Sequence, residues 1–142
     1  MKKISTLLIG LALSGTVFAQ TPPPASGAGT IGRTTDDCVL LNENITINLS
    51  GSVSGALHCN ADRIAISACH INGRQVSRQV DVRTPAGCGT PETPCTGTER
   101  ATRTGAAVPT ASTLRGTVAP EYPGGDCDAA LALATATAVP NE

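Results

Sequence analysis

This chain of 142 residues has a formal net charge of −1, and aromatic residues make up only 1% of it. The absence of a basic cluster argues against binding to nucleic acid or to an anionic membrane surface. The scarcity of aromatic rings argues against the stacking platforms that bind single-stranded nucleic acid, and against most sugar-binding sites. A folded core must therefore be built from Ile, Leu, Val and Ala.

Residues 1–19 have the pattern of a secretory signal peptide. Lys2 and Lys3 form a basic start that is followed by an apolar run over residues 4–13. This run is too short to span a bilayer, and small residues precede a cut near Ala19. We therefore expect export to the periplasm or the extracellular space, and the short MKK start indicates a bacterial origin. The cleaved chain would hold eight Arg, no Lys and eleven acidic residues.

The remaining chain divides into a flexible leader over residues 20–35 and a single β-domain over residues 36–142. The leader contains three consecutive prolines, several glycines and one large apolar residue, Ile31. Such a composition is typical of extended or disordered segments. Val39 and Leu41 are expected to begin a first short strand of the domain.

Residues 45–59 alternate between apolar odd positions and polar even positions, which predicts a β-strand. A strand of this length is about three times as long as the usual five or six residues. Gly51 and Gly55 fall on the apolar face, where a bend would fit. We expect either one bent strand or two strands that separate near one of these glycines.

Residues 63–82 contain Asn72-Gly73, which is a strong signal for a β-hairpin. A three-residue loop, with Gly73 in the left-handed conformation, gathers most apolar side chains on one face of the hairpin. That register places Arg63 opposite Asp81 as a cross-strand ion pair, which contributes well under about 1 kcal/mol if it is exposed.

The C-terminal half changes character. Residues 84–126 are rich in Thr, Pro and Gly and are predicted to be mostly long loops, with short strands around residues 106–108 and 113–118. Residues 127–139 alternate Ala with other residues. Ala and Leu favour a helix and Asp128 could cap one, but the strict alternation favours a strand. We expect a strand whose all-alanine face lets another sheet or chain approach closely.

An even number of cysteines in an exported chain predicts disulfide bonds, here three with fifteen possible pairings. The six candidates are Cys38, Cys59, Cys69, Cys88, Cys95 and Cys127. Each bond would stabilise the fold by about 2–4 kcal/mol. The short, proline-containing spacing favours a local bridge between Cys88 and Cys95. A bridge between Cys59 and Cys69 is disfavoured, because a strand from Arg63 would carry Cys69 roughly 20 Å away.

His58-Cys59 and Cys69-His70 supply the residue types of a tetrahedral zinc site. The same strand keeps these four side chains from converging, so we expect no metal site there. The sequence contains no G-x-S-x-G and no C-x-x-C motif, and His58 and His70 are its only histidines. We therefore expect no catalytic residues and no cofactor.

These observations predict an all-β fold, a disulfide-stabilised antiparallel β-sandwich whose architecture can be immunoglobulin-like, with long Pro/Thr/Gly-rich loops. Small side chains, polar strand faces and the lack of catalytic residues favour an exported, non-enzymatic structural or surface-assembly protein. Such a filament, matrix or envelope component would associate with itself or with other envelope proteins. The alternative is a soluble secreted binding module or inhibitor that acts through residues 84–126. Neither nucleic-acid binding nor a membrane span is expected.

Overall fold

The computed structural model describes residues 25–26, 29–84, 88 and 93–139. Its elements are β1 (Ala25–Ser26), β2 (Gly29–Arg33), β3 (Ile45–Leu49), β4 (Val53–Cys59), β5 (Ile64–His70), β6 (Val76–Thr84), β7 (Gly97–Gly105), β8 (Val108–Ser112), β9 (Thr117–Glu121) and α1 (Ala129–Ala138). The predicted signal peptide lies outside the described residues, as do residues 20–24 of the predicted leader.

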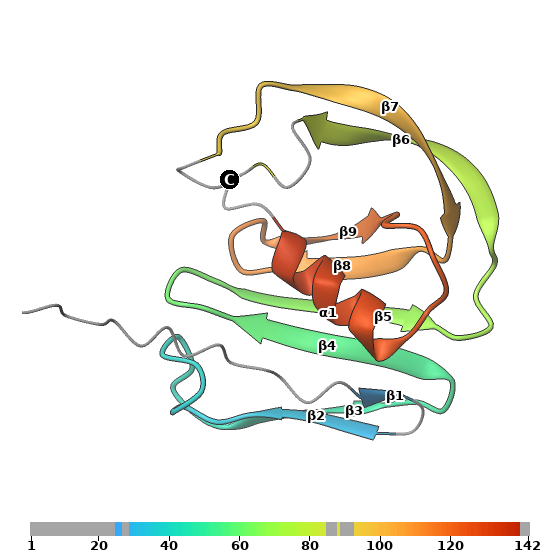
Figure 1. The fold of residues 1–142 in the computed structure, drawn as a ribbon. Coiled ribbons are helices and arrows are strands. Elements are labelled where there is room, and N and C mark those ends of the chain that lie inside the picture. Colours follow the sequence, from blue (N-terminus) through green and yellow to red (C-terminus); the bar gives the residue numbers. More distant parts are fainter. Residues whose placement is uncertain (1–24, 27–28, 85–87, 89–92, 140–142) are drawn as a thin grey trace, which may run out of the picture.

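Five strands form one antiparallel sheet in the order β1-β4-β5-β8-β9, while β2–β3 and β6–β7 form two separate two-stranded ribbons (Figure 1). The mostly β fold predicted from the sequence is confirmed. The sheets are separate and small, however, so the finer expectation of a sandwich with immunoglobulin-like architecture is not confirmed. A helix covers one face of the five-stranded sheet, and the β2–β3 ribbon packs on the other.

The helix α1 lies on the sheet face formed by alternate residues of β4 and β5 (Figure 1). Ala65 and Ala136 are both fully buried where the helix crosses β5. The Ser67 hydroxyl donates a hydrogen bond to the Ala132 carbonyl oxygen of the helix. These small side chains allow the helix and the sheet backbones to approach closely, which is the role that the sequence assigned to an alanine face.

The strand prediction for residues 127–139 is wrong, because this segment forms α1. The Asp128 carboxylate accepts a hydrogen bond from the Leu131 backbone nitrogen at 2.6 Å, which caps the helix. Ala132 and Ala136 are four residues apart and therefore lie on one helix face, where both are fully buried. The intrinsic helix preference of Ala and Leu, supported by this cap, outweighs the alternation of the sequence.

The opposite sheet face carries the largest apolar cluster. Ile31 of β2 and Leu57 of β4 are buried there, together with the Cys38–Cys59 disulfide. Side chains from β3 and β5 pack around them: Ile45, Ile47, Leu49 and Ile64, with Leu41 of the intervening loop. Every second residue of β2 is directed into this cluster, as the ladder opposes Ile31 to Ile47.

Residues 29–33 belong to the segment that was expected to be a flexible leader, but they form β2. A single large apolar residue is sufficient here, because only alternate positions of a strand face the core. Ile31 fills the central position, and Arg33, which is 4% exposed, donates from Nη2 to the Leu57 carbonyl oxygen at 3.1 Å. The expected short strand at residues 39–41 is absent from the structure, and a turn closed by Leu41 N to Cys38 O takes its place.

Residues 45–59 form two strands, β3 and β4, that separate at a turn containing Gly51. Ser52 has a φ of 67° in this turn, and Val53 N donates to Ser50 O at 3.2 Å. The structure therefore confirms the second expectation for this segment, which is two strands that separate near a glycine. At Gly55 a Cβ atom would lie 3.2 Å from side-chain atoms of both Ile31 and Leu49, so the glycine allows the ribbon to approach β4 closely.

The predicted hairpin over residues 63–82 is wrong. Strand β5 pairs on one edge with β4 and on the other with β8, so neither edge remains for β6. Strand β6 leaves the sheet and pairs with β7 over nine residue pairs. Arg63 consequently does not lie opposite Asp81, which instead faces Arg100 across the β6–β7 ladder.

The sequence prediction underestimates the strand content of residues 84–126. This range contains all of β7, β8 and β9. The strands expected around residues 106–108 and 113–118 correspond only in part to β8 and β9. Thr is among the residues that strands favour, and Thr98, Thr102 and Thr104 of β7 pair with residues of β6 across the ribbon.

Candidate functional site

All six cysteines are paired. Cys38–Cys59 ties the loop after β2 to the end of β4, and Cys69–Cys127 ties β5 to the start of α1. Cys88–Cys95 is the local bridge that the spacing favoured. The disfavoured bridge between Cys59 and Cys69 does not form. The first two bonds tie the β2–β3 ribbon and the helix to the five-stranded sheet, and the three bonds together leave no free thiol.

The residues of the considered zinc site stay apart. The β4–β5 ladder opposes Cys59 to Ile64 and Cys69 to Ser54, so the two cysteines lie at opposite ends of the strand pair. No group of three or more His, Cys, Asp or Glu side chains in the described part of the chain could hold a metal ion.

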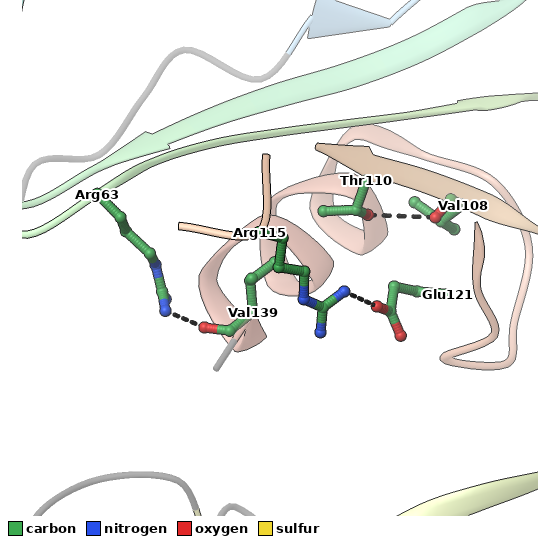
Figure 2. A network of polar contacts seen from close by, with 6 residues as sticks. All are labelled: Arg63, Val108, Thr110, Arg115, Glu121 and Val139. Atoms are coloured by element: carbon green, nitrogen blue, oxygen red, sulfur yellow. Dashed lines mark hydrogen bonds and ion pairs between the residues drawn. The ribbon is translucent and has the colours of Figure 1, made fainter. Parts of the chain in front are cut away.

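A buried arginine joins the sheet to the end of the helix. Arg63 is 5% exposed, and its guanidinium donates from Nη1 to the Val139 carbonyl oxygen (Figure 2). It also donates from Nη2 to the Thr137 carbonyl oxygen at 2.8 Å. A cation at these carbonyls also complements the negative end of the helix dipole. Burial lowers the pKa of Arg63, and the nearby Asp62 carboxylate counteracts that effect. The arrangement is structural and fixes α1 on the sheet.

His58 of β4 lies half-buried opposite Ala65, close to the position of Arg63 before β5. Burial lowers the pKa of its imidazole, and the positive charges of Arg63 and Arg33 lower it further. No cysteine thiol is available for this imidazole to activate, since all the cysteines are in disulfides. His70 is exposed at the other end of the ladder.

The best candidate for a binding surface is an open apolar groove of about 310 Å³ on the sheet face opposite α1. Its floor is formed by Ile64 and Ile66 of β5, Ala111 of β8 and Val118 of β9. The ladders oppose Ile66 to Ala111 and Ala111 to Val118, so these side chains share one face. Residues of the β8–β9 turn complete the lining: Ser112, Thr113, Gly116 and Thr117.

The groove begins where the β2–β3 ribbon ends. That ribbon covers β4 and reaches Ile64, while the same sheet face over β8 and β9 stays open. Val118 is 65% exposed as a result, and Leu114 at the turn is 42% exposed. On the helix side of the same hairpin, Arg115 Nη1 lies 2.6 Å from Glu121 Oε1 and holds the turn against the end of β9 (Figure 2).

The second unusual surface is the β6–β7 ribbon, which arches beyond β9 on the side of the molecule away from β2 and β3 (Figure 1). No other helix or strand of the described chain packs along it. At its base, the Arg78 guanidinium carbon lies 4.8 Å from the centroid of the Tyr122 ring, and Gly105 bridges to Gly125. At its other end, Cys88 and Cys95 close the chain beyond the last ladder pair.

One face of this ribbon is half apolar. The ladder opposes Val80 to Ala101 and Arg78 to Arg103, and alternate residues place these side chains on the same face. Val76 and Val82 extend that face, and like Val80 they are half-buried. A two-stranded ribbon is marginally stable on its own in water. An apolar stripe on such a ribbon therefore indicates a surface that gains from being covered.

Sequence reasoning identified neither surface. The groove requires the β5–β8 pairing, which joins segments more than 40 residues apart. The alternation of residues 76–82 was recognised, but it was assigned to a hairpin with β5. Residues 97–105, GTERATRTG, show no apolar alternation, and they were interpreted as loop.

Comparisons with protein families, with curated proteins and with solved structures give no match to this chain. The surfaces described above therefore carry the functional argument by themselves. Among the described residues, no helix has both the length and the apolar character needed to cross a membrane.

Proposed function

We propose that this protein is an exported, non-enzymatic structural protein that assembles with copies of itself at the cell surface, as a filament, matrix or envelope component. The observation that carries the proposal is the open apolar face over β5, β8 and β9, with Val118 65% exposed. A sheet face of this kind is normally buried against another layer. The chain holds a second surface, the ribbon, that lacks a covering layer among the described residues.

Three further features support the proposal. The three disulfides suit an oxidising environment outside the cytoplasm. The pairing of every cysteine leaves no thiol nucleophile for either histidine to activate. The groove is shallow and lacks the convergent polar groups with which an enclosed small-molecule site fixes its ligand.

The test is the size of the protein in solution. The full-length sequence is expressed in a bacterium, the exported product is recovered, and its N-terminus is determined. Sedimentation velocity over a hundredfold range of concentration should show species that grow with concentration, and negative-stain microscopy should show ordered assemblies. A monomer at every concentration would overturn the proposal.

A second candidate function is a secreted binding module or inhibitor that acts through residues 84–126. The Cys88–Cys95 bridge favours it, because a disulfide-closed connection at the end of a projecting ribbon is a suitable recognition tip. This candidate predicts a stable monomer that captures a different protein through that tip. The same sedimentation experiment therefore separates the two functions.

A further inference from the structure

We propose that the copies associate head to tail, with the β6–β7 ribbon of one copy docked in the apolar groove over β5, β8 and β9 of the next. The inference rests on the proposed self-assembly and specifies its interface. It commits to a second copy of this chain as the occupant of the groove.

The groove is uncovered, whereas the neighbouring part of the same sheet face is covered by a two-stranded ribbon. Over β4, that face is buried by the β2–β3 ribbon, which packs Ile31 and Leu49 against Gly55. The neighbouring strands β5, β8 and β9 present Ile66 and Val118 with no ribbon on top. A second two-stranded ribbon would therefore continue the layer that β2 and β3 begin.

The β6–β7 ribbon has the face that such a layer needs. Val76, Val80 and Val82 stand at alternate positions of β6, and Ala101 stands opposite Val80 on β7. Two strands lie about 5 Å apart, and packed sheets lie about 10 Å apart. A ribbon of this width covers the two to three strands that line the groove. The contact forms a sheet-on-sheet layer between two molecules.

The charges of the two surfaces are complementary. Arg78, Arg103 and Glu99 lie on the valine face of the ribbon and give that face a net charge of +1, while Arg83, Arg100 and Asp81 lie on the opposite face. Arg103 lies on the valine face of the ribbon and makes no hydrogen bond or ion pair with the described residues.

Acidic side chains stand at one end of the groove. Asp62 is exposed two residues before Ile64. The loop over residues 34–44 carries three more exposed carboxylates, and its Leu41 packs with Ile64 on the same cluster. The arginines of an incoming ribbon therefore meet carboxylates at this rim, and such complementarity favours binding in one orientation.

The interface is heterologous, because the ribbon and the groove are different surfaces of one chain. A heterologous contact that does not close into a ring propagates into a chain of molecules. An exposed ribbon at one end of each assembly and an exposed groove at the other remain available for further copies.

Two variants each disable one surface. Val118→Asp places a charge in the groove at a side chain that is 65% exposed in the monomer, so the fold tolerates it. Val80→Asp places a charge on the valine face of the ribbon, at a side chain that is half-buried. We expect each variant to raise the concentration required for assembly by at least about tenfold. Charge reversal by Arg103→Glu should weaken assembly by a smaller factor, most clearly at low salt.

Matched controls introduce Asp elsewhere. Ile71→Asp alters an apolar residue after β5 that is 44% exposed and does not line the groove. Gln79→Asp lies next to Val80 on the opposite face of the ribbon. Both controls should assemble like the wild type. Circular dichroism and an intact three-disulfide mass verify that every variant is folded.

Mixing the two disabled variants gives the decisive result. The Val118→Asp protein retains a working ribbon, and the Val80→Asp protein retains a working groove. An equimolar mixture should therefore form a 1:1 heterodimer that does not extend, while each variant alone stays monomeric. A ribbon-to-ribbon interface would instead let Val118→Asp assemble alone, and that outcome would overturn the inference.

The remaining outcomes are also informative. If the wild type assembles and both variants assemble as well, the ribbon–groove contact is wrong while the proposed function stands. If the wild type stops at a discrete dimer, the head-to-tail form is wrong. If the wild type is a monomer that binds an unrelated protein, both the proposed function and this inference are wrong.

Discussion

Arg63, just before β5, donates a hydrogen bond to the carbonyl oxygen of Val139, just after α1, across 76 positions of sequence (Figure 2). The same guanidinium reaches Thr137 O at 2.8 Å. The last carbonyls of a helix have no partner within the helix, so a buried end needs such a donor. One side chain thus joins the beginning of a central strand to the end of the only described helix.

Replacement of this arginine should loosen the helix. Arg63→Ala leaves buried carbonyls without donors, and we expect it to lower the free energy of unfolding by about 2–3 kcal/mol, measured by urea denaturation with the disulfides intact. Arg63→Lys keeps the charge but loses the two-pronged geometry, so its loss should be intermediate.

The control for this prediction is Arg100→Ala. Arg100 and Asp81 are 77% and 68% exposed in their side chains and lie 3.7 Å apart, so the change should cost less than about 1 kcal/mol. Equal losses for Arg63→Ala and Arg100→Ala would contradict a structural role for the buried arginine.

Because α1 packs closely on the sheet, the free energy of unfolding should depend strongly on side-chain size at this contact. Ala136 is fully buried against Ala65, and Ala136→Leu should lower the free energy of unfolding by about 1–3 kcal/mol. Ala134→Leu makes the same change at an exposed position of the helix and should be within about 0.5 kcal/mol of the wild type. Thermal denaturation of the two variants tests the difference, and similar melting temperatures would show that the helix does not pack as described.

The disulfides should differ in their contribution to stability. Cys69–Cys127 closes a separation of 58 residues, and Cys88–Cys95 closes one of 7. The chain-entropy model gives about 4 kcal/mol for the first and about 2 kcal/mol for the second. Double replacement of Cys69 and Cys127 by Ala should therefore cost more than double replacement of Cys88 and Cys95 by Ser. Guanidinium denaturation measures both, and a reversed order would indicate that the ribbon stabilises the domain.

The surroundings of His58 predict that the folded protein loses stability in mild acid. Its pKa is lower in the folded protein than in the unfolded chain, because of burial and then the charges of Arg63 and Arg33. The unfolded state therefore binds more protons, and the free energy of unfolding falls as the pH drops below about 6.5.

The variant His58→Gln should flatten this part of the stability profile. His70→Gln alters an exposed histidine and should keep the slope, because His58 is still present. Urea titrations between pH 5 and pH 8, spanning about the ordinary range of histidine, measure both profiles. An unchanged slope in His58→Gln would assign the pH dependence to other groups.

Several features followed from local sequence. The strand character of residues 45–59 and 76–82 is present, because alternation at period two is a property of a single segment. The Cys88–Cys95 bridge followed from short spacing. The exclusion of a Cys59–Cys69 bridge followed from the length of one strand.

Other features were decided by partners distant in the chain. The Asn72-Gly73 signal predicted a hairpin between β5 and β6, yet β5 has its two edges occupied by β4 and β8. Which strand pairs with an edge of β5 depends on all the strands of the sheet, and a local sequence pattern carries no information about that choice. The groove forms because β5 pairs with β8, and the ribbon forms because β6 pairs with β7 instead of β5.

The sequence by itself determined the composition of the core, the number of cysteines available for pairing and the positions where strands can form. These are local quantities, set by side-chain size, charge and periodicity. The tertiary structure decided between helix and strand for residues 129–138, where the sequence had arguments for both. It alone decided that residues 29–33 join the core and which sheet face stays open. Each of these depends on whether a distant surface is present to bury the segment: small residues beneath α1, β3 beside β2, and no layer over β8 and β9 in the described chain.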